Sequence, residues 1–213
     1  MKFKELISKF KDIFFYKRLG KSLNGCRSVL DVGCGSNSPI REVKKRFYSE
    51  GIDIDKPSII QSKKKKIHDR YIVGDIQDID KYYKQKSFDA VISTDVIEHL
   101  EKKDALRLLK KMEKIARKKI IILTPNGFYH QDHLDKNPHQ EHKSGWSVND
   151  LTRIKYKVYG LRGLKYIRGE YATIKYKPWI LWGFLAFITE VMLYYFPNFS
   201  YHLFAVKTLS DEK

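Results

Sequence analysis

The sequence contains little cysteine and no N-terminal stretch of the kind that directs secretion. The two cysteines, Cys26 and Cys34, form no disulfide framework and lack the spacing of a zinc site. Cys34 lies inside a glycine turn where a small residue is needed, so we interpret it as a packing residue. Because the N-terminus is charged throughout, no signal peptide is recognised, and we expect a cytoplasmic protein that could work at the inner face of a membrane.

Acidic residues are scarce relative to basic ones. Lysine and arginine number 42 against 25 aspartates and glutamates, which gives a formal net charge of +17. Such an excess favours anionic partners, whether nucleic acid, an acidic lipid surface or a phosphorylated substrate, and an ordinary basic surface is the other interpretation. At 213 residues, with 42% hydrophobic residues, the chain fits one globular domain large enough to bury a core.

Long hydrophobic runs are absent except for residues 179–196, which Pro178 and Pro197 bound. The length is marginal for a membrane span, and Glu190 within the run would be costly in hydrocarbon, so a true span is the least favoured interpretation. We expect either a helix buried by its own domain or a dimer partner, or a helix at a lipid interface. The aromatic density supports the second, as do three upstream lysines, Lys165, Lys175 and Lys177.

Apolar runs of strand length alternate with segments of helical periodicity from residue 27 onward. This alternation predicts a parallel sheet covered by helices on both faces. Residues 3–19 predict a basic amphipathic helix that either covers the ligand site or contacts a membrane. Residues 124–145 have little periodicity and form a loop longer than a connection needs. The expected strands are residues 28–32, 52–54, 71–75, 88–93, 119–123, 158–161 and 202–206.

A glycine-punctuated turn follows the first expected strand. Gly33 and Gly35 would let this turn pass close to a ligand, and Asp31 would face the crevice at the end of the strand. Asp53 ends the next strand about twenty residues later, where a carboxylate accepts hydrogen bonds from ribose hydroxyls. The third glycine of the dehydrogenase fingerprint is absent, because residues 36–38 are Ser-Asn-Ser. The pattern therefore predicts an adenosine-containing cofactor and matches the dehydrogenase fingerprint incompletely.

The acid-x-Gly-x-Gly form at Asp31, Gly33 and Gly35 resembles the class I S-adenosylmethionine-dependent methyltransferases, in particular the type-11-like branch. The resemblance extends through most of residues 27–160. It implies an α/β fold: a doubly wound, Rossmann-like, seven-stranded and mostly parallel sheet with an antiparallel last strand. One domain would span residues 1–213, with an N-terminal amphipathic helix (1–26), a cofactor-binding core (27–163), a hydrophobic helical insertion (164–199) and the last strand with a tail (200–213).

The resemblance also implies S-adenosylmethionine as the cofactor. The backbone at Gly33 and Gly35 would hold its methionine end, and Asp53, with Ile54 beside it, would bind both ribose hydroxyls. Asp75 matches the residue that hydrogen-bonds the adenine amino group, and Ile76 would pack on the ring.

Further matches lie in later segments. Ser93 opens the segment 93–100, which resembles the one that passes the sulfonium. Residues 124–127 match the end of the fifth strand, and residues 137–146 resemble a loop found in the same branch.

Four residues are candidates for the chemistry of the acceptor. His99 is the first candidate for a general base, and Asp95 at i−4 would orient it if the segment is helical. A structural histidine that only lines the pocket is the other interpretation. His133 and His142, with His139, are second candidates on the loop that would cover the acceptor. Although the loop histidines have short spacings, we expect no metal, because methyl transfer needs none.

Absent motifs narrow the reaction. No Asn/Asp-Pro-Pro-Tyr/Phe follows the fourth strand, which disfavours methylation of amino groups in adenine or glutamine, and no Pro-Cys nucleophile is present. We expect O-methylation of a small-molecule, lipid-linked or saccharide acceptor, with peripheral contact to an anionic membrane. An RNA methyltransferase and a catalytically inactive S-adenosylmethionine-binding protein are the alternatives. The oligomeric state is left open.

Overall fold

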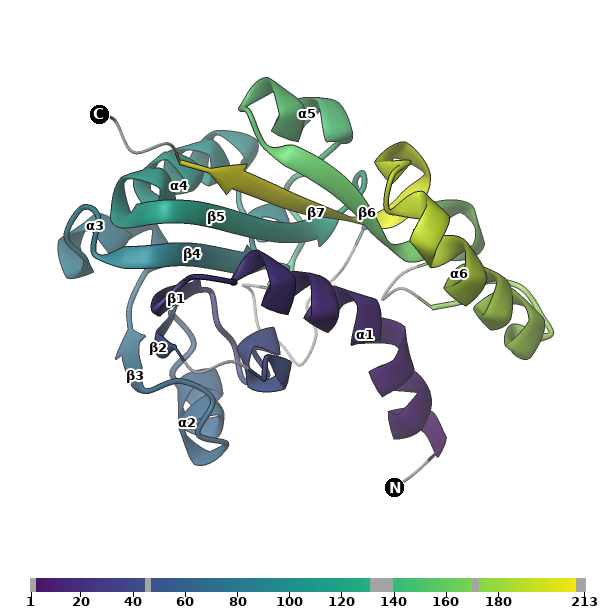
Figure 1. Cartoon of the computed structure of the whole chain (residues 1–213), viewed down its shortest axis with the longest axis horizontal. Helices are drawn as coiled ribbons and strands as arrows, with labels where there is room; N and C mark the ends of the chain where they lie inside the picture. The colour runs from purple at the N-terminus through teal and green to yellow at the C-terminus, as the bar shows by residue number, and fades with distance from the viewer. Residues whose placement is uncertain (1–2, 45–46, 131–139, 170–172, 210–213) are drawn as a thin grey trace.

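A computed structural model describes residues 3–44, 47–130, 140–169 and 173–209 (Figure 1). Within these residues the strands are β1 (Ser28–Val32), β2 (Tyr48–Asp53), β3 (Arg70–Val73), β4 (Phe88–Thr94), β5 (Ala116–Pro125), β6 (Lys157–Leu164) and β7 (Ser200–Thr208). The α-helices are α1 (Phe3–Ser22), α2 (Lys56–Lys64), α3 (Ile79–Tyr82), α4 (Lys102–Ile115), α5 (Val148–Arg153) and α6 (Trp179–Leu193).

The seven strands form one sheet in the order β3-β2-β1-β4-β5-β7-β6. β1 to β5 pair in parallel, and β7 runs antiparallel to both β5 and β6. The order reverses at β1, with β2 on one side and β4 on the other. In open α/β sheets such a reversal leaves a crevice at the carboxyl ends of the strands, where ligands bind. The predicted fold class is confirmed, including the antiparallel last strand.

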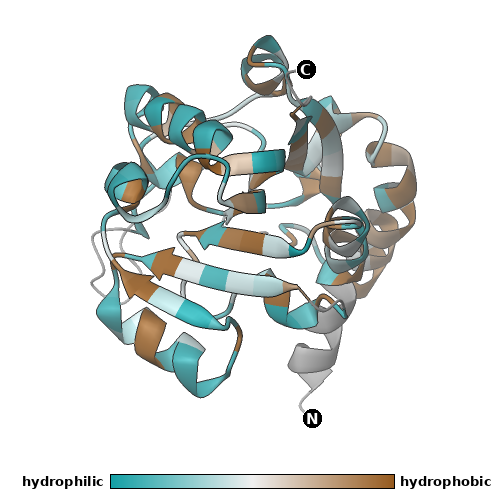
Figure 2. Cartoon of the chain, turned by 60° about the vertical axis from the view of Figure 1, so that its left-hand side comes forward, coloured by the Kyte–Doolittle hydropathy of each residue, from teal (hydrophilic) through white to brown (hydrophobic). Residues whose placement is uncertain are grey.

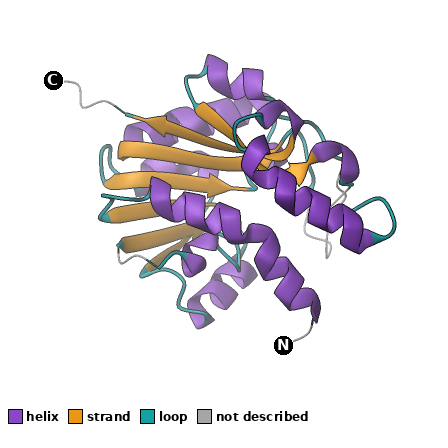
Figure 3. Ribbon diagram, turned by 45° about the vertical axis from the view of Figure 1, so that its right-hand side comes forward, coloured by secondary structure: helices purple, strands orange, loops and turns teal. Residues whose placement is uncertain are grey.

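Side chains of the central strands alternate between two apolar cores, one on each face of the sheet. Helices lie on both faces (Figure 3). On β5, Ile120 and Ile122 join the core under α3, α4 and α5, whereas Ile121 and Leu123 join the core under α1. Strands buried on both faces read as continuous apolar runs, which explains why residues 119–123 carry no polar alternation. The N-terminal helix therefore covers one face of the sheet with its second half.

Local capping explains two of the shorter elements. Ser147 accepts a hydrogen bond from the backbone of Asp150 and the Asp150 side chain accepts one in return, so a capping box starts α5. Ser38 caps the segment after the glycine turn, which is a short 3₁₀ helix, Pro39–Glu42.

α6 lies along β6 at the edge of the sheet. Ala186, Glu190 and Leu193 face the protein and are buried, whereas most other side chains of the helix are exposed. No helix in the described part of the chain is long and apolar enough to cross a membrane. The expectation of a helix fully buried by its own domain is therefore wrong, because only one narrow side of α6 contacts the sheet.

The contact between α6 and β6 depends on Gly160, and a matched pair of variants tests it. A Cβ at position 160 would overlap the carbonyl oxygen of Leu193 and lie 2.6 Å from the Cβ of Ser200. We expect Gly160→Ala to lower the free energy of unfolding by about 1–3 kcal/mol. Gly183→Ala is the control, since a Cβ there meets nothing within 4 Å and alanine favours a helix. Urea unfolding measures both, and equal stability of the two variants would contradict this account.

Candidate active site

The glycine turn after β1 brings the backbone to the carboxyl end of the sheet. Gly33 has φ +73°, and a Cβ there would lie 2.5 Å from Val96 Cγ2, so only glycine fits without strain. Gly35 has φ +53°, and its N–H donates to Asp53 Oδ2 at 2.8 Å. The turn after β1 and the end of β2 are thereby joined by a hydrogen bond to a side chain.

Asp31 is fully buried beneath this turn. We expected it to face the cavity, and it does not. Ser38 Oγ donates to Asp31 Oδ2, and His68 Nε2 lies 3.0 Å from the same oxygen. Ser93 is also fully buried, and its hydroxyl donates to the carbonyl of Val32 at 3.1 Å. Neither Asp31 nor Ser93 is among the described residues that line the cavity. Their contacts position the backbone of the turn and of the neighbouring strands.

A cavity of about 780 Å³ runs along the carboxyl ends of β1, β2, β3 and β4. Its volume is within the usual range for small-molecule sites, about 300–1,000 Å³. Asp53 lines the cavity at the end of β2, and burial raises the pKa of its carboxyl group although two backbone N–H groups oppose the shift. Those N–H groups belong to Gly35 and Asp55.

The other residues that we predicted to bind the cofactor at the ends of β2 and β3 also line this cavity. Ile54 and Asp75 are exposed, and Ile76 is half-buried. Asp75 Oδ1 accepts a hydrogen bond from the backbone of Gln77 at 2.8 Å, which fixes the carboxylate at the end of β3. Asp53 and Asp75 thus present carboxylates from neighbouring strands to one cavity.

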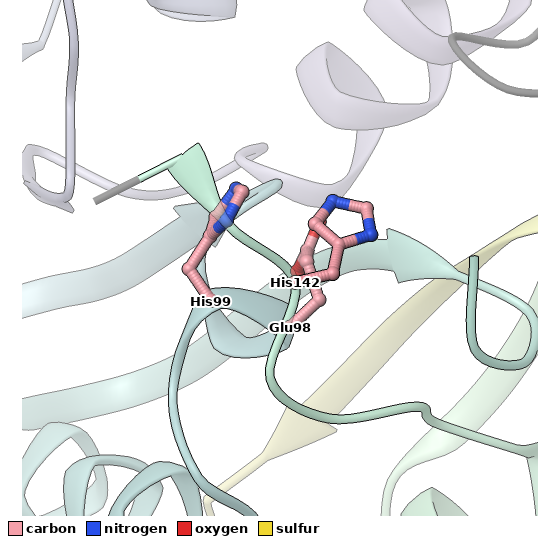
Figure 4. A group of neighbouring side chains, drawn as sticks. All are labelled: Glu98, His99 and His142. Carbon is pink, nitrogen blue, oxygen red and sulfur yellow. The ribbon is translucent and has the colours of Figure 1, made fainter. Parts of the chain in front are cut away.

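A cluster of Glu98, His99 and His142 lines the same cavity beyond the end of β4 (Figure 4). Glu98 and His99 belong to a 3₁₀ helix, Ile97–His99. The following loop is held against this helix because the N–H groups of Lys143 and Ser144 both donate to the Glu98 carbonyl, at 2.8 and 3.0 Å. This pairing places the two imidazoles 4.8 Å apart, centroid to centroid.

Both imidazoles have one nitrogen bound to a backbone carbonyl. His99 Nδ1 lies 3.0 Å from the carbonyl of Glu141, and His142 Nδ1 lies 2.8 Å from that of Tyr129. A carbonyl only accepts, so each Nδ1 carries the proton and each Nε2 is left with a lone pair. Burial lowers the pKa of both histidines, which favours the neutral forms.

These groups could hold a metal ion. One ligand atom from each of Glu98, His99 and His142 lies within 4.8 Å of the others. Metal-bound histidines characteristically donate their second N–H to a carbonyl or carboxylate, as both imidazoles do here. Burial raises the pKa of Glu98 well above its usual range, with the nearby Asp95 carboxylate adding to the shift.

Asp95 does not pair with His99, the partner that we expected, and has other partners. Its backbone is left-handed, with φ +54°, and Oδ1 lies 3.1 Å from His202 Nε2 on β7. Oδ2 lies 3.7 Å from the guanidinium of Arg162 on β6. Burial would raise the pKa of Asp95, but Arg162 and His202 outweigh burial and hold it at about 2. Asp95 therefore pairs with the far side of the cavity rather than with His99.

The sequence analysis missed Arg162 and His202. Arg162 is an isolated charge between Gly160 and Gly163 in an apolar strand, and His202 is an isolated polar residue in another. These interruptions were the available signal, and both residues line the cavity. His133 and His139 lie outside the described residues.

Comparisons with known proteins agree with this geometry. Residues 30–123 match the family described as methyltransferase domain, type 11. A curated relative, the small RNA 2'-O-methyltransferase of Tetrahymena thermophila, is 27% identical over 180 residues, covering 70% of this chain and 42% of the relative. The chain thus spans less than half the length of that relative.

Two solved structures share the fold. An S-adenosylmethionine-dependent methyltransferase from Archaeoglobus fulgidus is 17% identical to this chain, with a TM-score of 0.62. The match covers 98% of this chain and 100% of that structure. Magnesium protoporphyrin IX methyltransferase from Synechocystis PCC 6803, with bound S-adenosylmethionine, has a TM-score of 0.53 and 15% identity, with 94% and 79% covered. Residues 30–123 thus resemble the methyltransferase domain family, and the two structures show that the chain has the fold of S-adenosylmethionine-dependent methyltransferases.

Proposed function

We propose that this chain transfers a methyl group from S-adenosylmethionine to a hydroxyl oxygen of a small-molecule, lipid-linked or saccharide acceptor. One observation carries the proposal: the cavity that Asp53 and Asp75 line continues to two imidazoles, each with its Nδ1 bound to a backbone carbonyl. The first half suits an adenosine-containing cofactor, and the second suits removal of a proton from an alcohol. The Synechocystis neighbour, named for a porphyrin substrate, supports a small molecule.

The proposed chemistry is a single displacement. The acceptor oxygen forms a bond to the methyl carbon as the carbon–sulfur bond breaks, and S-adenosylhomocysteine leaves with the electron pair. The hydroxyl proton goes to His99 Nε2, whose neutral form is favoured by burial. Positioning supplies most of the acceleration, because the sulfonium is already an activated leaving group.

Cofactor binding is tested by calorimetry with S-adenosylmethionine and S-adenosylhomocysteine. We expect Asp53→Ala to weaken both affinities by about tenfold or more, because a charged hydrogen-bond acceptor for the ribose is lost. Asp80→Ala is the control, since Asp80 is an exposed acid whose carboxylate pairs with Lys111. Asp53→Asn, which keeps an acceptor for the Gly35 N–H, guards against a merely unfolded variant. No binding by the folded wild type would refute the proposal.

The acceptor is tested with methyl-labelled S-adenosylmethionine and separate lipid, glycan and RNA fractions. We expect label in the lipid or glycan fraction, and a loss of about 100-fold or more in His99→Ala without loss of cofactor affinity. Cofactor binding without label in any fraction would favour a catalytically inactive binding protein.

RNA is the second candidate acceptor. The Tetrahymena relative is named for RNA, and the net charge of +17 favours a polyanion. Label in the RNA fraction, together with RNA binding that weakens steeply with salt, would support this candidate over the first.

A metal ion is the second candidate role for the Glu98, His99 and His142 cluster. The two Nε2 lone pairs and the buried carboxylate support this role. We expect Mn²⁺ to bind in calorimetry and Glu98→Gln to weaken it by about tenfold or more, with Glu141→Gln, which keeps the backbone contact to His99, as the control. Absence of Mn²⁺ binding, and activity that a chelator leaves unchanged, would leave His99 as a simple base.

A further inference from the structure

Exposed apolar side chains gather on α6 and the turn that follows it. Eleven of the nineteen large apolar side chains that are exposed in the described part of the chain lie between residues 179 and 199. We call these the α6 surface: Trp179, Ile180, Leu181, Phe184, Phe187, Ile188, Val191, Met192, Tyr195, Phe196 and Phe199. Scattered apolar residues on a surface are ordinary, whereas a contiguous group marks an interaction site.

α6 has no polar side facing outward. A surface helix of a globular protein ordinarily turns an apolar stripe inward and charged residues outward. Here the inward side holds the one charged residue of the helix, Glu190, whose Oε1 accepts a hydrogen bond from the Arg162 backbone at 2.9 Å. The outward side holds Ile180, which is 85% exposed, and Phe184, which is 62% exposed. Most of α6 carries the hydrophobic colour in Figure 2. The exposed side is therefore apolar and uncharged.

Basic residues flank the N-terminal end of this surface. Lys175 and Lys177 are exposed, and Lys177 Nζ lies 5.3 Å from the ring centroid of Trp179. Lysines with tryptophan and tyrosine at the edge of an apolar face are characteristic of helices that lie at the boundary between lipid headgroups and acyl chains. The flanking lysines add electrostatic attraction to anionic lipids.

We propose that the α6 surface docks on an anionic lipid bilayer, with the helix lying in the plane of the interface. Its 15 residues correspond to roughly 22 Å of helix, short of the ~30 Å of hydrocarbon that a span must cross. A second copy of this chain is the competing occupant. It fits less well, because pairing two chains that each carry +17 would bring their lysines together, whereas an anionic bilayer neutralises them.

The docking surface adjoins the acceptor end of the cavity. α1 packs beside α6, with the Phe14 and Phe187 ring centroids 5.4 Å apart and the Arg18 guanidinium 3.6 Å from the Tyr194 ring (Figure 3). Asp12 of the same helix lines the cavity. A bilayer under α6 would therefore lie near the part of the cavity proposed to receive the acceptor.

Sedimentation of the full chain with vesicles tests the proposal, using phosphatidylcholine alone and phosphatidylcholine mixed with phosphatidylglycerol. We expect binding to the mixed vesicles, reduced by high salt, and a partition coefficient at least about tenfold lower for Ile180→Asp. Ile60→Asp is the matched control, since Ile60 is an exposed isoleucine, also on a helix, in α2. Lys175→Glu with Lys177→Glu should remove most of the preference for the anionic vesicles.

Two results would overturn the proposal. One is a folded wild-type protein that stays in the supernatant with both kinds of vesicle. The other is a dimer in light scattering that Ile180→Asp converts to a monomer, which would assign the α6 surface to a second copy. Calorimetry with S-adenosylmethionine on Ile180→Asp should match wild type, so failure of docking is distinguishable from failure of the proposed function.

Discussion

Arg162, whose side chain is largely buried, joins the elements around the end of the cavity that lies away from Asp53 and Asp75. Its backbone N–H donates to Glu190 on α6, and its Nε donates to Asp12 on α1 at 3.1 Å. Its NH1 nitrogen lies 2.9 Å from His202 on β7 and 3.7 Å from Asp95 after β4. A buried cation is tolerable only when anions and acceptors surround it, so these elements must keep their positions together. Arg162 thus joins α1 to the sheet through its side chain and α6 through its backbone N–H.

The end of the cavity proposed to bind the cofactor is organised differently. Hydrogen bonds between residues at the carboxyl edge of the sheet hold it in place. Asp53 accepts from the backbone of Gly35 and Asp55, and the buried Asp31 accepts from Ser38 in the turn and pairs with His68 before β3. Each bond joins neighbouring strands or the turn above them. The geometry therefore follows from the order of β1, β2 and β3, with little contribution from the rest of the chain.

That difference explains which features could be predicted from sequence. The strands are encoded locally, so apolar runs were sufficient to predict them, and spacing placed Asp53 at the end of β2. The prediction for Asp75 came from the family resemblance. The expected Asp95–His99 pair assumed an α-helix, but the segment is a 3₁₀ helix and the left-handed backbone of Asp95 directs it toward β7. Its partner His202 is 107 residues away in sequence. No local sequence pattern encodes such a contact. The same holds for the hydrogen bonds between the loop and the 3₁₀ helix that bring His142 to His99.

Asp95 and Glu98 are three residues apart, yet the structure moves their pKa values in opposite directions. Arg162 and His202 keep Asp95 ionised, whereas burial and the Asp95 charge favour the protonated form of Glu98. Neighbouring acids separated in this way mark proton-handling sites. The carboxylate of Glu98 can gain a proton or a cation, and each excludes the other because a metal ligand must be deprotonated. In the proposed reaction, the occupant of Glu98 would therefore decide between the two roles proposed for the imidazoles beside it, base or metal ligand.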